Sequence, residues 1–355
     1  MLDSSVSPSG WLAFLAQHGA HFDSATPGPA LLGFGDDSLV PPSDLLAPLT
    51  DLGLLAFSGD DAASFLHNQL TNDVEHLGTN EARLAGYCTP KGRLLASFLI
   101  WNSAGTIYLQ LPRVMLAAIH KRLQMFVMRS KVKIEDVSDS IVALGVSGTR
   151  AAQVLQPWFS DLPASPYDKI DSDSGSLIRL ADADGVPRYQ WIVTQELAMT
   201  AWPALTVELA AAGTSAWLLG DIRAGIPRIT PATQEQFVPQ MINFELIGGV
   251  NFKKGCYPGQ EIVARSQYLG KLKRRAALAT VAAPNVVAGT EIFSSADTDQ
   301  PCGMVINAAL STADISSCLV EIKLAACDAG TVHLGSATGP VLNFEPLPYA
   351  LTEPA

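Results

Sequence analysis

The chain has 355 residues, a hydrophobic fraction of 48% and a formal net charge of −11 at pH 7. This length exceeds one typical domain and the composition supplies a globular core, so we expect two or three compact units. The negative charge excludes indiscriminate binding to nucleic acids, which needs a broad basic face.

The lack of a recognisable targeting signal and the cysteine usage predict a cytoplasmic protein. No apolar run reaches the length of a membrane span, and residues 1–5 lack the basic start and apolar stretch of a secretory signal. The five cysteines are odd in number and scattered, which is a poor disulfide framework. There is no C-x-x-C pair and no His at metal-finger spacing from a Cys. We therefore expect no structural metal and no cluster held by this chain alone.

The elements fall into three regions along the chain. Residues 1–48 predict a short apolar helix around 11–15, which ends at Gly19, and then an irregular linker rich in Pro and Gly over 20–45. Residues 49–275 alternate short apolar runs with helical periodicity, which predicts an α+β core. The strands are expected at 52–57, 83–88, 94–101, 106–111, 132–137, 141–146, 176–181 and 189–194, and the helices after Gly59 and at 114–128, 149–159 and 196–212. Residues 276–355 show only short apolar runs between turns, which predicts a small C-terminal β-barrel or sandwich.

The densest chemistry lies in the segment Lys253-Lys254-Gly255-Cys256-Tyr257-Pro258-Gly259-Gln260-Glu261. Pro258 suits the first position of a helix, and Glu261 would then lie in the first turn, where a carboxylate is favoured. Cys256 would precede a helix N-terminus, with Lys254 two residues earlier, and both neighbours favour a thiolate. The segment therefore predicts a reactive, partly exposed thiol. A buried structural cysteine in a tight turn is the alternative.

The string K-G-C-Y-x-G-Q-E at 254–261, continued by Ile262-Val263-Ala264-Arg265, resembles the signature of the YgfZ family. Supporting matches lie at 65–73, 90–93 and 223–227. The resemblance covers roughly residues 50–345, far more than one motif could claim, and leaves residues 1–48 outside.

The resemblance implies the fold of the glycine-cleavage T-protein, an aminomethyltransferase that uses tetrahydrofolate, with three subdomains around a central pocket that binds folate. In the T-protein a carboxylate pair follows a hairpin glycine and acts near the reactive nitrogen of the folate. The matching residues here are Ala96 and Ser97, which cannot take up a proton. An acid near the pterin is matched by Gln190, whose amide forms hydrogen bonds without carrying charge. The resemblance thus implies that binding is retained and aminomethyl transfer is lost.

The function implied is a folate-binding accessory protein for iron–sulfur cluster assembly or repair, which supports tRNA modification indirectly through client enzymes or assembly proteins. Cys256 is the expected functional thiol and Lys254 tunes it, while Gly255, Tyr257 and Gly259 complete the motif. Folate contacts are expected from Asn72, Gln190, Trp191, Arg223, Gln260, Glu261 and Arg265.

Structural alternatives stay open for several of these residues. Asn72 and Glu261 equally suit helix capping, and Arg223 and Arg265 suit structural ion pairs. Trp191 is favoured as a core residue over a pterin-stacking one. The remaining cysteines lie in apolar runs and are expected to be inert core residues; they are Cys88, Cys302, Cys318 and Cys327.

Three other functions compete with the accessory role. A folate-dependent aminomethyltransferase or other one-carbon transferase ranks below it because of Ala96 and Ser97. Direct contact with tRNA through the basic stretch 253–275 is possible on charge but is not favoured, since the whole chain is acidic. A purely structural scaffold is the third alternative.

Overall fold

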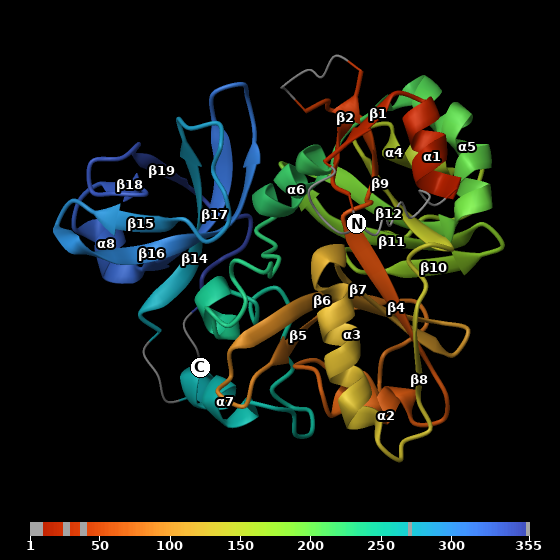
Figure 1. Ribbon diagram of the computed structural model, residues 1–355, viewed down its shortest axis with the longest axis horizontal. Coiled ribbons are helices and arrows are strands. Elements are labelled where there is room, and N and C mark those ends of the chain that lie inside the picture. The colour runs from red at the N-terminus through yellow and green to blue at the C-terminus, as the bar shows by residue number, and fades with distance from the viewer. Residues whose placement is uncertain (1–9, 24–28, 36–40, 269–271, 353–355) are drawn as a thin grey trace, which may run out of the picture.

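A computed structural model describes residues 10–23, 29–35, 41–268 and 272–352 (Figure 1). Lys271 of the basic stretch, Pro27 of the linker and residues 1–5 lie outside these ranges. Within them the chain forms a five-stranded sheet and a six-stranded sheet, each with helices packed on it, and a C-terminal sheet. None of the helices described is both long and apolar enough to cross a membrane.

A five-stranded antiparallel sheet is formed in the order β5-β6-β7-β4-β8. Its strands are short apolar runs that are buried along most of their length in one continuous core. Helix α3 packs on β4 and β7, and α2 leads from β4 toward β5. The bounds are β4 Leu52–Ser58, α2 Ala62–His67, β5 Ala82–Cys88, β6 Leu94–Ser103, β7 Thr106–Pro112, α3 Arg113–Val127 and β8 Lys133–Asp136.

A six-stranded sheet is formed in the order β10-β11-β12-β9-β3-β13. Helices α1 and α5 pack together over this sheet through a T-shaped contact of Trp11 with Trp202. The helices predicted at 149–159 and 196–212 are observed as α4 and α5, and both are shorter than predicted. Helix α5 ends at Glu208 because the residues that follow form β13, which pairs with β3. The bounds are α1 Gly10–Gln17, β3 Leu45–Pro48, β9 Ile141–Ser147, α4 Ala151–Leu155, β10 Lys169–Ser172, β11 Gly175–Ala183, β12 Val186–Thr194, α5 Gln195–Glu208 and β13 Ala210–Ala211.

The first 48 residues do not stand apart from this sheet. The prediction of an irregular linker over 20–45 is wrong where the chain is described, because β1 (Ala20–Phe22) and β2 (Leu31–Phe34) pair as an antiparallel ribbon. Strand β3 (Leu45–Pro48) then pairs with β9 in the middle of the sheet. Short strands between prolines are hard to recognise because each buries too few residues to show a period.

The C-terminal region is a six-stranded antiparallel sheet in the order β18-β15-β16-β17-β14-β19, which curls into a half-barrel (Figure 1). The expected small β-rich region is observed, but it also contains the short helix α8, and a closed barrel is not seen among the described residues. Among the described residues a single bridge, between His333 and Val341, joins the two edges. The bounds are β14 Arg274–Val281, β15 Glu291–Ser294, β16 Asp297–Leu310, β17 Ser316–Lys323, α8 Leu324–Asp328, β18 Val332–Leu334 and β19 Leu342–Glu345.

Helix α6 (Thr214–Arg223) joins the regions. It packs against β11 of the six-stranded sheet and against β16 and β17 of the C-terminal sheet (Figure 1). Its indole Trp217 lies where Gly145 has no side chain; a Cβ there would come within 2.5 Å of the ring. The segment after α6 continues through a short 3₁₀ helix (Pro239–Ile242) to α7 (Gln260–Tyr268). Helix α6 therefore supplies side chains at the centre of the molecule.

Candidate functional site

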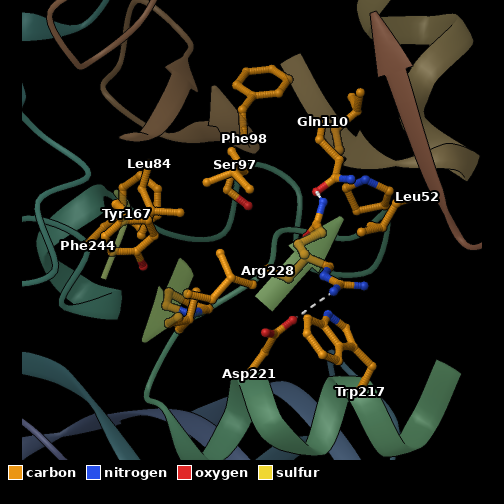
Figure 2. Close-up of a pocket in the computed structure, with 17 residues that line it drawn as sticks. Leu52, Leu84, Ser97, Phe98, Gln110, Tyr167, Trp217, Asp221, Arg228 and Phe244 are labelled. Atoms are coloured by element: carbon orange, nitrogen blue, oxygen red, sulfur yellow. Dashed lines mark hydrogen bonds and ion pairs between the residues drawn. The ribbon is translucent and has the colours of Figure 1, made fainter. Parts of the chain in front are cut away.

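A small cavity of about 80 Å³ lies between the five-stranded sheet, the six-stranded sheet and α6 (Figure 2). This central cavity is smaller than a typical small-molecule site, about 300–1,000 Å³, so it would hold only part of a larger ligand. Aromatic rings form much of its wall, contributed by Phe98, Tyr167, Trp217 and Phe244. Such a wall suits a flat, partly apolar ligand.

Two buried glutamines face the cavity from neighbouring sheets. The Nε2 of Gln190 on β12 donates to the Oε1 of Gln110 on β7 over 2.7 Å (Figure 2). Each amide carries both a donor and an acceptor, and the bond uses one group of each side chain. No described residue provides a hydrogen bond to the other amide group of either glutamine. The pair therefore presents one donor and one acceptor to a ligand.

A chain of buried ion pairs closes the floor of the cavity. Arg228 donates to Asp51 over 2.7 Å and to Asp221 over 2.8 Å. Arg188 donates to the other oxygen of Asp221 over 2.5 Å and lies over the ring of Trp217. Two cations thus face two anions in this network, of which Arg228 and Asp221 line the cavity, so the network adds almost no net charge to the wall.

Among the four residues of this ion-pair network, Asp51 has the fewest side-chain hydrogen bonds. Its Oδ1 is buried and has no hydrogen-bond partner among the described residues. Burial raises the pKa of Asp51, and the Arg228 guanidinium opposes the rise. The carboxyl is held in place by one arginine only, at the turn that precedes β4.

The two positions matched to the T-protein carboxylates differ in where they lie. Ser97 lines the cavity and its Oγ accepts a hydrogen bond from the Ile229 N–H over 3.0 Å. Ala96 is fully buried in the core and does not line it. Asp221 brings a carboxylate to the cavity from α6, which the sequence argument did not foresee. Both of its oxygens are occupied by arginines, so it is not a free proton acceptor.

A broad open groove adjoins the central cavity and shares Leu84 and Tyr167 with it. Asn72, Lys253 and Tyr268 line this groove. The Asn72 amide is buried and donates to the carbonyls of Leu84 and Gly248, so it braces the groove. The groove leads from the central cavity to the chain segment that precedes Cys256.

The motif segment lies against the C-terminal end of α2. The Nζ of Lys254 donates to the carbonyl oxygens of His67 over 2.5 Å and Leu70 over 2.9 Å. Burial lowers the pKa of Lys254 to about 8, against the opposing charges of Asp73, Cys256 and Glu75. Cys256 is an exposed free thiol, and it lines neither the central cavity nor the groove. The alternative of a buried structural cysteine is therefore excluded.

The turn after Cys256 differs from the prediction. Helix α7 begins at Gln260, so Pro258 is not its first residue and Cys256 lies four residues ahead of the helix. Gly259 has a φ of +81° and packs against the hairpin at 89–92. A Cβ at Gly259 would come within 2.4 Å of the Thr89 carbonyl and 2.6 Å of Gly92. Close backbone approach, rather than helix capping, determines this part of the motif.

Several known proteins resemble this chain in sequence. Residues 46–172 match the model of the GCVT N-terminal domain. The tRNA-modifying protein YgfZ of Colwellia psychrerythraea is 30% identical over 315 residues, which cover 87% of this chain and 94% of the relative. That of Enterobacter sp. is 31% identical over 311 residues, with coverage of 87% and 94%. The chain belongs to the YgfZ family.

The fold of this YgfZ family member is that of an aminomethyltransferase. The crystal structure of glycine cleavage system aminomethyltransferase T from Bartonella henselae superposes with a TM-score of 0.77 and covers 95% of this chain and 96% of its own. The two sequences are only 16% identical, so this likeness concerns the fold. The family expected from the sequence is confirmed, and so is the aminomethyltransferase-like fold with mixed α and β content. The expected number of subdomains stays a prediction.

The structure does not bring all the predicted folate contacts to the central cavity. Trp191 is buried in the core, where its Nε1 donates to the Ser174 carbonyl, as the favoured alternative predicts. Arg223 forms a surface ion pair with Asp184 over 2.8 Å. Arg265 and Glu261 are exposed on α7, and Gln260 bonds weakly to the Gly255 carbonyl. Of the seven predicted contacts, Gln190 alone lines the central cavity and Asn72 lines the groove.

The remaining cysteines follow the prediction with one exception. Cys88, Cys302 and Cys318 are buried, and burial raises the pKa of Cys88 and of Cys318 to about 12. Cys327 was expected in the core but is exposed on α8. Within the described residues, no group of three or more His, Cys, Asp or Glu side chains is placed to hold a metal ion.

Several cavity residues were not expected from the sequence. Arg228 and Asp221 flank the matched segment 223–227, and Gln110 and Tyr167 lie outside every matched string. The sequence does carry one signal for Arg228 and Asp221, because both are charged residues within a largely apolar stretch. Gln110 stands among apolar residues of a strand, which also marks an inward-facing polar group.

The raised pKa of Asp51 predicts a pH-dependent contribution to stability. Below the ordinary aspartate pKa of about 3.9 the carboxyl is protonated in both states, and its contribution is fully present. That contribution is lost as pH rises through the raised folded-state pKa. Relative to Asp51→Asn, the wild type should lose free energy of unfolding between pH 4 and 7, by about 1.4 kcal/mol per unit of pKa difference. Urea denaturation over this range measures the loss. Asp139→Asn, in the surface pair with Arg113, is the control. Parallel curves for the wild type and Asp51→Asn would contradict the prediction.

Gly259→Ala should destabilise the fold through its contact with the 89–92 hairpin. The matched control is Gly105→Ala, because Gly105 has the same φ of +81° and a Cβ there meets no atom within 4 Å. The left-handed conformation alone costs about 1–2 kcal/mol in either variant. The clash at Gly259 adds to this, so we expect a larger fall in the free energy of unfolding by urea. An equal fall in both variants would show that the hairpin moves away without cost.

Proposed function

We propose that this protein is a folate-binding accessory factor for iron–sulfur cluster assembly or repair, which supports tRNA modification indirectly and uses Cys256 as its functional thiol. The observation that carries the proposal is the state of the one carboxylate that lines the central cavity. Asp221 is held by Arg188 and Arg228, so the cavity is suited to binding and not to proton transfer.

The central cavity of about 80 Å³ is too small for a whole folate, but its lining and the adjoining groove of about 620 Å³ together offer contacts that suit one. The edge of a pterin ring alternates hydrogen-bond donors and acceptors, and the Gln110–Gln190 pair has one of each available. The rings of Phe98, Tyr167 and Trp217 offer flat apolar contacts to the faces of such a ligand. A bound tetrahydrofolate would supply one-carbon chemistry. The residues of this chain would orient it and exclude water.

A one-carbon transferase is the second candidate function. Asp221 favours it, since a carboxylate does line the cavity. Its two ion pairs favour the accessory role more strongly, because displacing an arginine would leave a buried charge uncompensated. Turnover of a tetrahydrofolate derivative with an aminomethyl donor, lost in Asp221→Asn, would establish the transferase instead.

An indirect role in tRNA modification fits the charges better than direct RNA contact. The relatives above carry the name tRNA-modifying protein. In the basic stretch 253–275, however, Arg274 is paired with Glu321 and Arg275 with Glu245. The exposed cations that remain in its described part are Lys253, Arg265 and Lys273. Three cations on a chain of net charge −11 form a weak electrostatic site for a polyanion.

Removal of both cavity glutamines should weaken folate binding. The double variant Gln110→Leu with Gln190→Leu leaves neither amide unsatisfied, and it removes two hydrogen bonds to the ligand worth about 0.5–1.5 kcal/mol each. The loss of about 1–3 kcal/mol corresponds to an affinity for tetrahydrofolate about 5- to 150-fold lower, measured by isothermal titration calorimetry. Gln153→Leu, at an exposed position of α4, is the matched control. Wild-type affinity in the double variant, or no heat of binding in the wild type, would refute folate binding at this cavity.

Cys256→Ser should abolish most of the protein's support for iron–sulfur enzymes. The assay is the activity of a cluster-dependent enzyme in a strain that lacks its own family member and expresses each variant at equal level. Cys327→Ser is the matched control, because Cys327 is the other exposed thiol of the described chain. We expect the control to rescue fully. Full rescue by Cys256→Ser would remove the thiol from the proposed function.

A further inference from the structure

Helix α3 carries large apolar side chains on the face that points away from the protein. Its inner face packs on β4 and β7 through five buried residues, which are Met115, Leu116, Ile119, Leu123 and Val127. On the outer side Val114 and Phe126 are exposed, and Met125 has an exposed fraction of 62%. Figure 1 shows α3 on the viewer's side of the five-stranded sheet. Apolar side chains that gather on one exposed face indicate an interaction surface.

The outer residues of α3 repeat at the spacing of a contact between two helices. Val114, Ala118, Lys121 and Met125 are separated by four, three and four positions, and all four are exposed. We call these residues the outer stripe of α3. Alternating gaps of three and four follow one side of a helix and form the narrow seam of a coiled coil. A helix that lies in a membrane interface needs a wider apolar face than this. The outer stripe therefore has the geometry of a seam for one further helix.

The end of α3 holds one more apolar side chain in solvent. Met128 lies three positions after Met125 and directly follows the last helical residue, Val127. Its side chain is 87% exposed, and its φ of +44° is a conformation that residues other than glycine adopt rarely. An exposed methionine adds little to folding, whereas its flexible side chain adapts well to the surface of a partner. Met128 thus extends the apolar surface beyond the outer stripe.

The charges around the outer stripe indicate what kind of helix it accepts. Residues 113–134 contain six basic residues and no acidic one, in a chain of net charge −11. Lys121, inside the stripe, and Arg129, just after Met128, form no ion pair within the described residues. The other four basic residues have partners: Arg113 pairs with Asp139, Lys131 with Asp60 and Lys133 with Glu135, and Arg122 lies over the ring of Tyr87. Two unpaired cations beside an apolar seam favour a partner that brings carboxylates.

A second copy of this chain does not meet that condition. Lys121 lies halfway between Val114 and Met128, so a symmetric antiparallel pair of α3 helices would bring the two copies of Lys121 together. Like charges at such a contact are destabilising. An anionic membrane would attract the cations, but Lys121 would then stand in the middle of the inserted face. A helix with apolar residues along one side and glutamates beside them satisfies both the seam and its cations.

We propose that the outer stripe of α3, extended by Met128, is a docking surface for an acidic amphipathic helix of a partner protein. Apolar side chains of that helix pack against Val114, Ala118 and Met125, and its carboxylates pair with Lys121 and Arg129. A helix of 15 residues is about 22 Å long, so the contact is smaller than a standard protein interface and the complex is transient. The inference goes beyond the proposed function, because it involves neither the central cavity nor Cys256.

Titration of the full-length protein with two synthetic helices tests the proposal. Both probes are fluorescein-labelled peptides of three heptads with leucine at positions a and d; one carries glutamate at e and g, and the other carries lysine there. Binding is measured by fluorescence anisotropy. We expect the glutamate peptide to bind roughly tenfold more tightly than the lysine peptide, with an advantage that shrinks as the salt concentration rises. Lys121→Glu should reverse this preference.

Met125→Glu separates the seam from a general attraction between charges. It places a carboxylate in the middle of the apolar contact and should weaken binding of the glutamate peptide by roughly tenfold. Its free energy of unfolding by urea should stay close to that of the wild type, because the side chain is exposed. Val207→Glu is the matched control, since Val207 is 78% exposed on α5 and the chemical change is similar. Equal binding of the two peptides by the wild type, or an unchanged affinity in Met125→Glu, overturns the proposal.

Two other occupants of the surface would give different results. A dimer of the wild type in analytical ultracentrifugation that Met125→Glu dissociates would assign this face to a second copy. Cosedimentation with vesicles of phosphatidylglycerol and phosphatidylcholine that Met125→Glu abolishes would assign it to a membrane. Either result overturns the acidic helix as the occupant. Neither result touches the folate titration or the rescue assay of Cys256, so failure of the inference and failure of the proposed function are distinguishable.

Discussion

The buried Arg228 guanidinium is the interaction on which the centre of the molecule depends. It joins Asp51, before the first strand of the five-stranded sheet, to Asp221 on α6, and Arg188 extends the chain to the six-stranded sheet. Truncation of one member of such a network would leave a buried charge without a partner, at a cost of about 3–5 kcal/mol. The ion pairs therefore fix α6 against both sheets. They also pair the two charged groups of an otherwise largely apolar cavity wall, Arg228 and Asp221, so that the wall is nearly neutral.

A second set of contacts fixes the thiol segment to the same scaffold. Lys254 satisfies two carbonyl oxygens at the end of α2, where helices leave such groups without partners. Gly259 lies against the hairpin at 89–92, whose next strand, β6, carries Ser97 in the cavity wall. The motif and the cavity are thus held by adjacent parts of one sheet. The groove lined by Asn72 and Lys253 connects them along the surface.

Local patterns predicted much of this architecture, and long-range pairing accounts for what they missed. Strands β4 to β7 were predictable because they are short apolar runs bounded by turn residues, and helix α3 because its apolar residues repeat at helical spacing. Strand β13 has two residues and pairs in parallel with β3, more than 160 positions away, so no local signal marks it. Cys256 was identifiable from its motif, whereas Arg228 and Asp221 act through partners that are distant in sequence.

The separation of thiol and cavity bears on how a folate would act here. In a transferase the reacting atom and its proton acceptor must lie within about 3 Å of each other. In this chain the cavity carboxylate is neutralised, and the exposed thiol does not line the cavity. A folate hydrogen-bonded to the Gln110–Gln190 pair would therefore not contact Cys256. An effect on the thiol would have to pass through the groove, which shares Leu84 and Tyr167 with the cavity. By reciprocity, a change at the thiol segment would then alter the affinity for folate by the same factor.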